Sequence, residues 1–356
     1  MNAPGAADAL YRDLPDSLTV YPHQLDLLRD NMMLIRVSER EFADASFLDR
    51  RLLSGQRPAA WFTWDQIAAR MAQRPAGTTA HLIFHVGHCG STLISRLLGE
   101  LGVLGLREPL PLRTLAEVHA ELDRPECRWS PATFEARFAL LHDLFDRGQG
   151  PRSVKATSFC NDLAAPFLQS HPARRATIVC TGLRPYLANV LVGPNSRLDL
   201  LSAAPLRLKR LSARAGAEVG RLAGMSQGVI SAMSWATEMA ALAAVADAFG
   251  DRVAILDFDR FLADVRGTLR TLAEHVVPGS IPAHQINAAA GSLWLSRYSK
   301  APEHAYDADL RQRVLADGER QFGDEIRRGV EWCERTAERV PAVARALELF
   351  DRPQSR

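Results

Sequence analysis

The chain has 356 residues, of which 47% are hydrophobic and 24% are charged, a composition that excludes a disordered or fibrous protein. A formal net charge of +2 argues against the strongly basic surface of a nucleic-acid binder or a polybasic membrane patch. Five cysteines without a CxxC pair argue against a disulfide framework or a zinc knot, so a reducing compartment is expected, by default the cytoplasm.

The first 78 residues are expected to form a mostly helical extension of the main domain. Residues 1–15 have the composition of a loose tail, with acidic residues and without the apolar run of a secretory signal. A short strand is expected around Met32–Val37, followed by a helix over Ser38–Leu53. The segment RPAGTT at 74–79 is predicted to be the linker to the next domain.

The central part of the chain alternates apolar runs of strand length with helical segments. The run AHLIFHV at 80–86 is nearly continuous, as expected of a strand that is covered on both faces. The alternation predicts an α/β fold, a P-loop-type three-layer sandwich with a central, mainly parallel sheet over residues 79–300 and a helical segment 301–356 packed on it. Further strands are expected at 103–106, 152–158, 175–181 and 252–258, and helices at 91–102, 112–122, 131–146, from Arg184, at 226–249 and at 260–276.

Two later segments need separate interpretation. The most apolar long run, Ile230–Phe249, contains Glu238 and Asp247, so we expect a buried helix rather than a membrane span. Residues 193–224 are rich in Arg, Leu and Ser with scattered Pro and Gly, and they are predicted to form a mobile lid.

The clearest functional signal is FHVGHCGSTLISRLL at 84–98, in which a strand, a Gly-containing turn and a helix follow in that order. This arrangement points the free N–H groups of a helix N-terminus at an anion. Gly87 and Gly90 allow the backbone to approach a phosphate. The hydroxyls of Ser91 and Thr92 can donate hydrogen bonds to it or cap the helix. The loop differs from the Walker A pattern GxxxxGK[ST], because only two residues separate the glycines and no Lys precedes the serine.

This loop and the segments after it resemble the P-loop sulfotransferase superfamily over roughly residues 80–300. In that family a loop such as PRSGTT holds the 5′-phosphosulfate end of 3′-phosphoadenosine 5′-phosphosulfate (PAPS). Gly90, Ser91 and Thr92 match the GTT of this loop. His88 stands where the family usually has Arg or Lys.

Three later segments extend the resemblance. SVKATS at 153–158 is similar to the family strand that delivers a lysine to the transferred group. IVCTGLRPYLANVL at 178–191 looks like the segment with the 3′-phosphate-binding arginine, although the serine expected about two turns later is absent. RYSKAPEHAY at 297–306 is similar to the late basic loop that closes over the nucleotide. The matching residues are Lys155, Arg184, Arg297 and Lys300.

The resemblance implies an enzyme that moves a sulfuryl group from PAPS to a hydroxyl or amine of a small-molecule or peptide acceptor by in-line displacement, without a metal ion and without a nucleic-acid partner. Trp294, Tyr298 and Tyr306 are available to stack on a base or acceptor, or to pack. The implied nucleotide-binding residues are Gly87, His88, Cys89, Gly90, Ser91, Thr92, Arg184, Arg297 and Lys300.

Catalytic candidates also converge without the resemblance, because ligands of parallel sheets bind beyond the carboxyl ends of the strands. Glu108, Lys155 and Arg184 each follow or end a predicted strand, as the loop does. Lys155 is one of only three lysines among 43 basic residues, and its flexible ammonium suits a bridge between the leaving phosphate and the sulfuryl group. Glu108, fixed at the strand end by Pro109, is the candidate base. His88 is either a leaving-group stabiliser or a second base.

These residues also have simple structural alternatives: a surface lysine, a solvated glutamate, and a loop histidine bonded to the backbone. His81 and His85 are expected to be structural. Cys89 lies where helix N–H groups can lower a thiol pKa, but no His–Cys–acid arrangement is visible in the sequence. The loop itself can be an ordinary strand–helix turn with a serine cap.

Two other classes of function stay open. One is a P-loop kinase or nucleotide hydrolase, with VAILD at 253–257 as a passable Walker B strand, although the missing loop lysine weighs against it. The other is a catalytically degenerate nucleotide binder, which is favoured if His88 cannot replace the missing cation.

Overall fold

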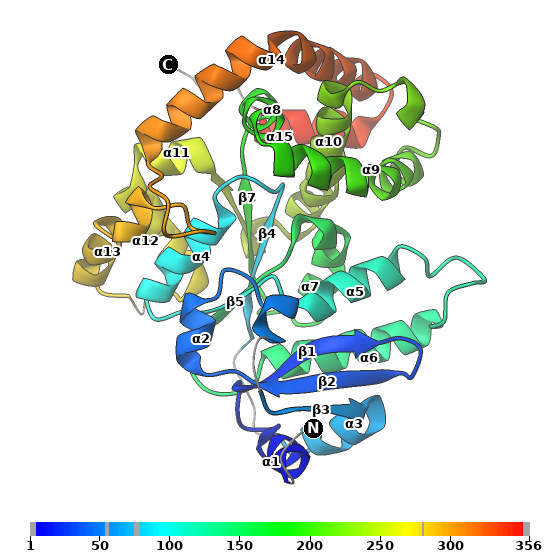
Figure 1. Cartoon of the computed structure of the whole chain (residues 1–356), viewed down its shortest axis with the longest axis vertical. Coiled ribbons are helices and arrows are strands. Elements are labelled where there is room, and N and C mark those ends of the chain that lie inside the picture. The colour runs from blue at the N-terminus through cyan, green and yellow to red at the C-terminus, as the bar shows by residue number, and fades with distance from the viewer. Residues whose placement is uncertain (1–4, 54–56, 75–78, 280, 352–356) are drawn as a thin grey trace.

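The computed structural model describes residues 5–53, 57–74, 79–279 and 281–351, and a parallel five-stranded sheet stands at its centre (Figure 1). The spatial order is β5-β6-β4-β7-β8, and every neighbouring pair is parallel. Helices flank this sheet, which confirms the predicted α/β fold. The strands are β4 (His81–His85), β5 (Leu104–Arg107), β6 (Arg152–Lys155), β7 (Ala176–Cys180) and β8 (Val253–Asp257).

Helices cover the sheet and gather at one end of it. In Figure 1, α4 and α11 to α13 lie on one side, α5 to α7 lie on the other, and α8 to α10, α14 and α15 gather at the top. The helices are α4 (Ser91–Glu100), α5 (Leu110–His119), α6 (Pro131–Phe145), α7 (Ala164–Gln169), α8 (Leu183–Val192), α9 (Pro194–Ala215), α10 (Gln227–Phe249), α11 (Phe258–Ala263), α12 (Val265–Val276), α13 (Ala283–Ala290), α14 (Ala308–Ala337) and α15 (Pro341–Phe350).

The N-terminal region differs from the prediction of a mostly helical extension. It forms an antiparallel sheet of β1 (Val20–Asp26), β2 (Asn31–Arg36) and β3 (Ala59–Thr63) at the bottom of Figure 1. The strand expected around Met32–Val37 is confirmed as β2. The burial pattern of β2 largely alternates, as expected of a half-buried strand, whereas β1 and β3 contradict the helical prediction.

The helices of this region are also shorter or placed differently than expected. The predicted loose tail contains helix α1 (Ala6–Asp13) within its described part. The helix expected over Ser38–Leu53 is only α2 (Glu39–Asp44), followed by a 3₁₀ turn at Arg50–Leu53. A capping box begins α2, and the extended backbone at Ala45 ends it. Later in this region, helix α3 (Trp64–Met71) directly follows β3. Of the expected linker, residues 75–78 lie outside the described residues.

Two buried arginines tie this region to the central domain. Arg107, at the end of β5, donates to the carbonyl oxygens of Phe42 and Ala45 at 2.8 and 2.7 Å. Arg96, on α4, donates to the carbonyl oxygen of Asp44 at 3.1 Å. These carbonyls lie at the end of α2, where a helix leaves acceptors unsatisfied. Burial lowers the pKa of Arg107 to about 10.

The segment predicted as a mobile lid, 193–224, is mainly the 22-residue helix α9, which packs against α10. Its buried residues Leu200, Ala204, Arg207 and Leu211 recur at helical spacing, and this pattern explains why a helix forms.

Among the described residues, Gln227–Arg252 is the one helix long and apolar enough to cross a membrane by length and composition. In its apolar stretch of 18 residues, 83% are buried inside the protein.

Helix α14 approaches α8 so closely that a side chain has no room at the contact. A Cβ atom on Gly318 would lie 2.2 Å from the carbonyl oxygen of Ala188. We expect Gly318→Ala to lower the free energy of unfolding by about 1–3 kcal/mol, because the helices must separate. Gly323→Ala, on the same helix with no atom within 4 Å of its Cβ position, should leave stability unchanged or raise it by about 0.5–1 kcal/mol. Urea unfolding of both variants checks this, and equal midpoints would contradict the packing argument.

Candidate functional site

The loop between β4 and α4 is a tight bend of left-handed residues. Gly87, His88 and Gly90 have φ angles of +89°, +52° and +74°. A histidine in this region is uncommon and costs backbone energy, which is typical of functional loops. Gly90 is the N-cap of α4 and supplies no capping side chain, so the first turn of the helix is open to an external acceptor.

His85 holds the entrance of this loop. Its Nδ1 accepts the N–H of Gly87 at 2.9 Å, and its Nε2 donates to the carbonyl oxygen of Ala156 at 2.9 Å. Burial, together with the charge of Lys155, keeps the pKa of His85 well below its ordinary value, so the ring is neutral. His81 bonds to the hydroxyl of Thr177. Both histidines therefore use a ring nitrogen inside the fold, in line with the structural role expected for them.

A cavity of about 250 Å³ opens at the start of α4. Thr92 lines it, and the Thr92 hydroxyl is buried without a hydrogen-bond partner among the described residues. A buried polar group of this kind indicates a missing partner. Three cationic residues and one acidic residue line the same cavity, and this excess of positive charge favours an anion as that partner: Arg297, Lys300 and Arg311 against Asp307.

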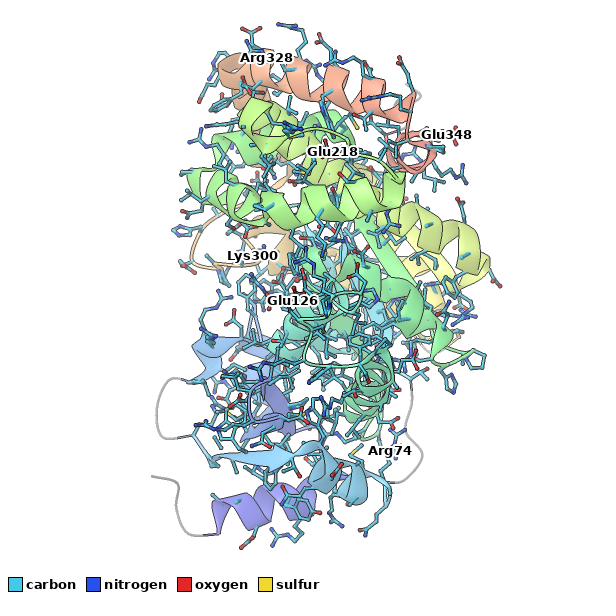
Figure 2. All side chains as sticks on the ribbon, turned by 90° about the vertical axis from the view of Figure 1, so that its right-hand side faces the viewer. Arg74, Glu126, Glu218, Lys300, Arg328 and Glu348 are labelled. Carbon is cyan, nitrogen blue, oxygen red and sulfur yellow. The ribbon has the colours of Figure 1, made fainter. Side chains whose placement is uncertain are left out.

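The basic wall of the cavity is fixed by neighbouring segments. Arg311, on α14, donates to Asp259 at 2.7 Å and is almost fully buried. The loop that carries Lys300 is held by Arg96, which donates to the carbonyl oxygen of Ser299 at 3.0 Å. Figure 2 shows Lys300 at mid-height, between the helices at the top and the N-terminal sheet below. Helices α4 and α14 therefore set the position of the cations around the loop.

Lys155 and Glu108, the two other catalytic candidates, form an ion pair next to β4 and are not among the residues that line the cavity. The ammonium of Lys155 donates to Oε1 of Glu108 at 2.5 Å, and their side chains are 0% and 15% exposed. They meet because β5 and β6 are adjacent parallel strands. Arg107, the residue before Glu108, lies opposite Lys155. Glu108 has a left-handed φ of +51°. Burial lowers the pKa of Lys155, and the Glu108 carboxylate opposes this shift.

His88 is neutral in the free protein. Burial, followed by the charge of Lys300, lowers the pKa of His88 to about 4. Its Nδ1 lies 3.4 Å from the hydroxyl of Ser196, and its carbonyl oxygen accepts from Asn189 at 3.1 Å. In this state the ring does not supply the cation expected at this position from the sequence resemblance.

Two predicted site residues lie in different surroundings from those expected. Arg184 is not among the residues that line the cavity, and its exposed side chain pairs with Glu319 at 2.6 Å. Cys89 donates to the carbonyl oxygen of Val179, and burial raises the pKa of its thiol to about 11. The thiol is therefore not a thiolate nucleophile, and the pKa lowering considered from the sequence is wrong.

The sequence reasoning missed Arg311 as a cavity residue. It is one of 40 arginines, and no local motif separates it from the others. Of the aromatic candidates, Tyr298 and Tyr306 line the cavity, whereas Trp294 stacks under the guanidinium of Arg96 at 4.0 Å. The remaining predicted residues of the loop that line it are His88, Cys89, Gly90 and Ser91.

The ring of Phe258 covers the loop at Gly90, where a Cβ atom would lie 2.0 Å from the ring. We expect Gly90→Ala to cost about 1–3 kcal/mol more in unfolding free energy than Gly102→Ala. Both glycines have positive φ, so both substitutions strain the backbone by about 1 kcal/mol, but Gly102 has no atom within 4 Å of its Cβ position. Urea unfolding measures the difference, and equal costs would show that Phe258 does not close on the loop.

Comparison with known proteins gives no family model and no curated protein that matches this chain. Among solved structures, a sulfotransferase domain from the curacin biosynthetic pathway matches with 11% identity and a TM-score of 0.38, over 72% of this chain and 98% of that chain. Sulfotransferase STF9 from Mycobacterium avium matches with 12% identity and a TM-score of 0.37, over 90% of this chain and 98% of that chain. Similarity at this level adds no functional argument, which therefore rests on the site itself.

Proposed function

We propose that the protein is a sulfotransferase that uses PAPS to sulfate a hydroxyl or amine of a small-molecule or peptide acceptor. The observation that carries the proposal is the unpartnered, buried hydroxyl of Thr92 at the start of α4, in a cavity with three cationic residues. A helix N-terminus with basic neighbours binds phosphate and sulfate groups. The Lys155–Glu108 pair beside this loop adds an acid–base couple.

The charged and apolar side chains that line the cavity suit an adenosine phosphosulfate. The start of α4 would receive the 5′-phosphosulfate, and the cationic lining residues would neutralise the other phosphate. Apolar side chains beside them offer a surface for the adenine ring. These apolar lining residues are Phe258, Leu262, Leu295 and Tyr298.

The reaction is a displacement at sulfur. The acceptor oxygen or nitrogen forms the new bond to sulfur, the bond from sulfur to the 5′-phosphate oxygen breaks, and the acceptor loses a proton. The products are the sulfated acceptor and adenosine 3′,5′-bisphosphate. Lys155 would neutralise the leaving phosphate. The ammonium of Lys155 donates to Oε1 of Glu108, and we assign Oε2 to take the acceptor proton.

The two alternatives differ in their support. Asp257, the acid of the Walker B-like strand, lies on β8, which is separated from β4 by β7. Its carboxylate caps α11 by accepting the N–H of Arg260 at 2.9 Å, so its position does not favour a kinase or hydrolase. The neutral state of His88 favours the second alternative, a nucleotide binder without transfer activity.

Ligand-dependent thermal stability tests the proposal. We expect adenosine 3′,5′-bisphosphate and PAPS to raise the melting temperature without metal, because a ligand at about 100 times its Kd stabilises by about 2.7 kcal/mol. A response to ATP only in the presence of Mg²⁺ would instead support a kinase or hydrolase. Turnover of labelled PAPS with a panel of hydroxyl and amine acceptors then separates the enzyme from the degenerate binder.

Substitution of Lys155 tests its proposed role. Lys155→Met keeps most of the buried volume and removes the charge, so transfer should fall by about 10²–10³-fold while bisphosphate affinity changes little. Lys209→Met is the matched control, because Lys209 bonds to Ala120 and Glu121 away from the loop. Sulfation rate and bisphosphate affinity are measured for both. An unchanged rate in folded Lys155→Met would remove Lys155 from the mechanism.

A further inference from the structure

A second basic group lies beside the loop, outside the residues that line the cavity. Arg207, on α9, is 3% exposed, and its Nε donates to Glu238 at 2.9 Å. Its Nη2 lies 3.4 Å from the hydroxyl of Ser158. Its Nη1 is buried and has no hydrogen-bond partner among the described residues. A buried guanidinium N–H without an acceptor is costly, so its position indicates an absent anionic partner.

The charge of the surrounding cluster also favours an anion. Glu238 accepts from Arg207 and Arg210, and Asp162 accepts from Arg210 and Arg214. Three guanidinium groups therefore face two carboxylates, and one positive charge is left over in a largely buried region. Asn161 completes the contacts of Glu238 with a neutral amide at 3.1 Å.

Ser158 connects this cluster to the loop. Ser158 is three residues beyond Lys155 on the same chain segment. Its hydroxyl lies 3.4 Å from the position that a Cβ atom on Gly87 would take. Arg207 is therefore linked to the loop through Ser158, which follows β6, whereas the cavity is lined by residues of α8, α11 and α14 and does not include Arg207.

We propose that Arg207 and Ser158 bind the oxygens of the sulfuryl group, which makes Arg207 a further catalytic residue of the proposed sulfotransferase. During the displacement, negative charge is spread over the three sulfuryl oxygens while the old S–O bond breaks and the new bond to the acceptor forms. The guanidinium and the hydroxyl stabilise this charge through hydrogen bonds and transfer no proton themselves. This inference rests on the proposed function.

The test compares two ligands that differ only by the sulfuryl group. Calorimetry gives the Kd of PAPS and of adenosine 3′,5′-bisphosphate for the wild type, Arg207→Lys and Ser158→Ala. We expect the affinity for bisphosphate to stay within about twofold. We expect PAPS affinity to fall about tenfold in Arg207→Lys and severalfold in Ser158→Ala. Arg214→Gln is the control, because Arg214 belongs to the same cluster but pairs with Asp162.

A second probe uses inorganic sulfate on the complex with bisphosphate, where the sulfuryl position is empty. Wild type should bind sulfate, and both variants should bind it severalfold more weakly. Ser158→Ala covers the case in which Arg207→Lys does not fold. An unchanged ratio of PAPS affinity to bisphosphate affinity in a folded variant would overturn the proposal. This result is also the one expected if Arg207 instead binds an acid group of the acceptor.

These measurements distinguish failure of the proposed function from failure of the proposed role of Arg207 and Ser158. If the wild type binds neither bisphosphate nor PAPS, the proposed function is wrong, and sulfate alone is then titrated into the free protein. Loss of sulfate binding in Ser158→Ala would still support an anion site at Arg207. Equal sulfate binding by wild type and Ser158→Ala would overturn that site as well.

Discussion

The arrangement of the site depends on a neutral, buried histidine at the end of β4. His85 joins the first N–H of the loop to the carbonyl oxygen of Ala156, which directly follows β6. The loop, α4 and the strand of Lys155 are therefore fixed relative to one another by two hydrogen bonds that need the same uncharged tautomer. The low pKa that burial imposes on this ring keeps that tautomer over the physiological pH range.

Around this fixed bend, positive charge comes from other segments of the chain, while the bend itself contributes only a neutral histidine. Arg297, Lys300 and Arg311 line the cavity, and Arg207 lies 3.4 Å from the hydroxyl of Ser158, next to Gly87. The loop itself has no lysine before Ser91, and the cations around it come from segments distant in sequence. Because these cations are supplied by other segments, the short loop can use its backbone N–H groups to bind an anion.

Much of the central domain is predictable because its signals are local. Continuous apolar runs mark buried parallel strands, and their shared polarity brings Glu108 and Lys155 together at one sheet edge. Arg311 and Arg207 carry no local signal, since only tertiary packing distinguishes them from the other arginines. Arg184 shows the converse: its position after β7 is as expected, but its side chain turns to Glu319 on α14.

The position of Arg311 has a consequence for the order in which the molecule is assembled during synthesis. The sheet and the phosphate loop are complete once β8 has left the ribosome, but one cationic wall of the cavity belongs to the first turn of α14. A nascent chain can therefore bury its central strands before this wall of the cavity exists. If the proposed ligand stabilises the fold, it can do so only late in biosynthesis, and earlier intermediates depend on the packing of the sheet and its helices.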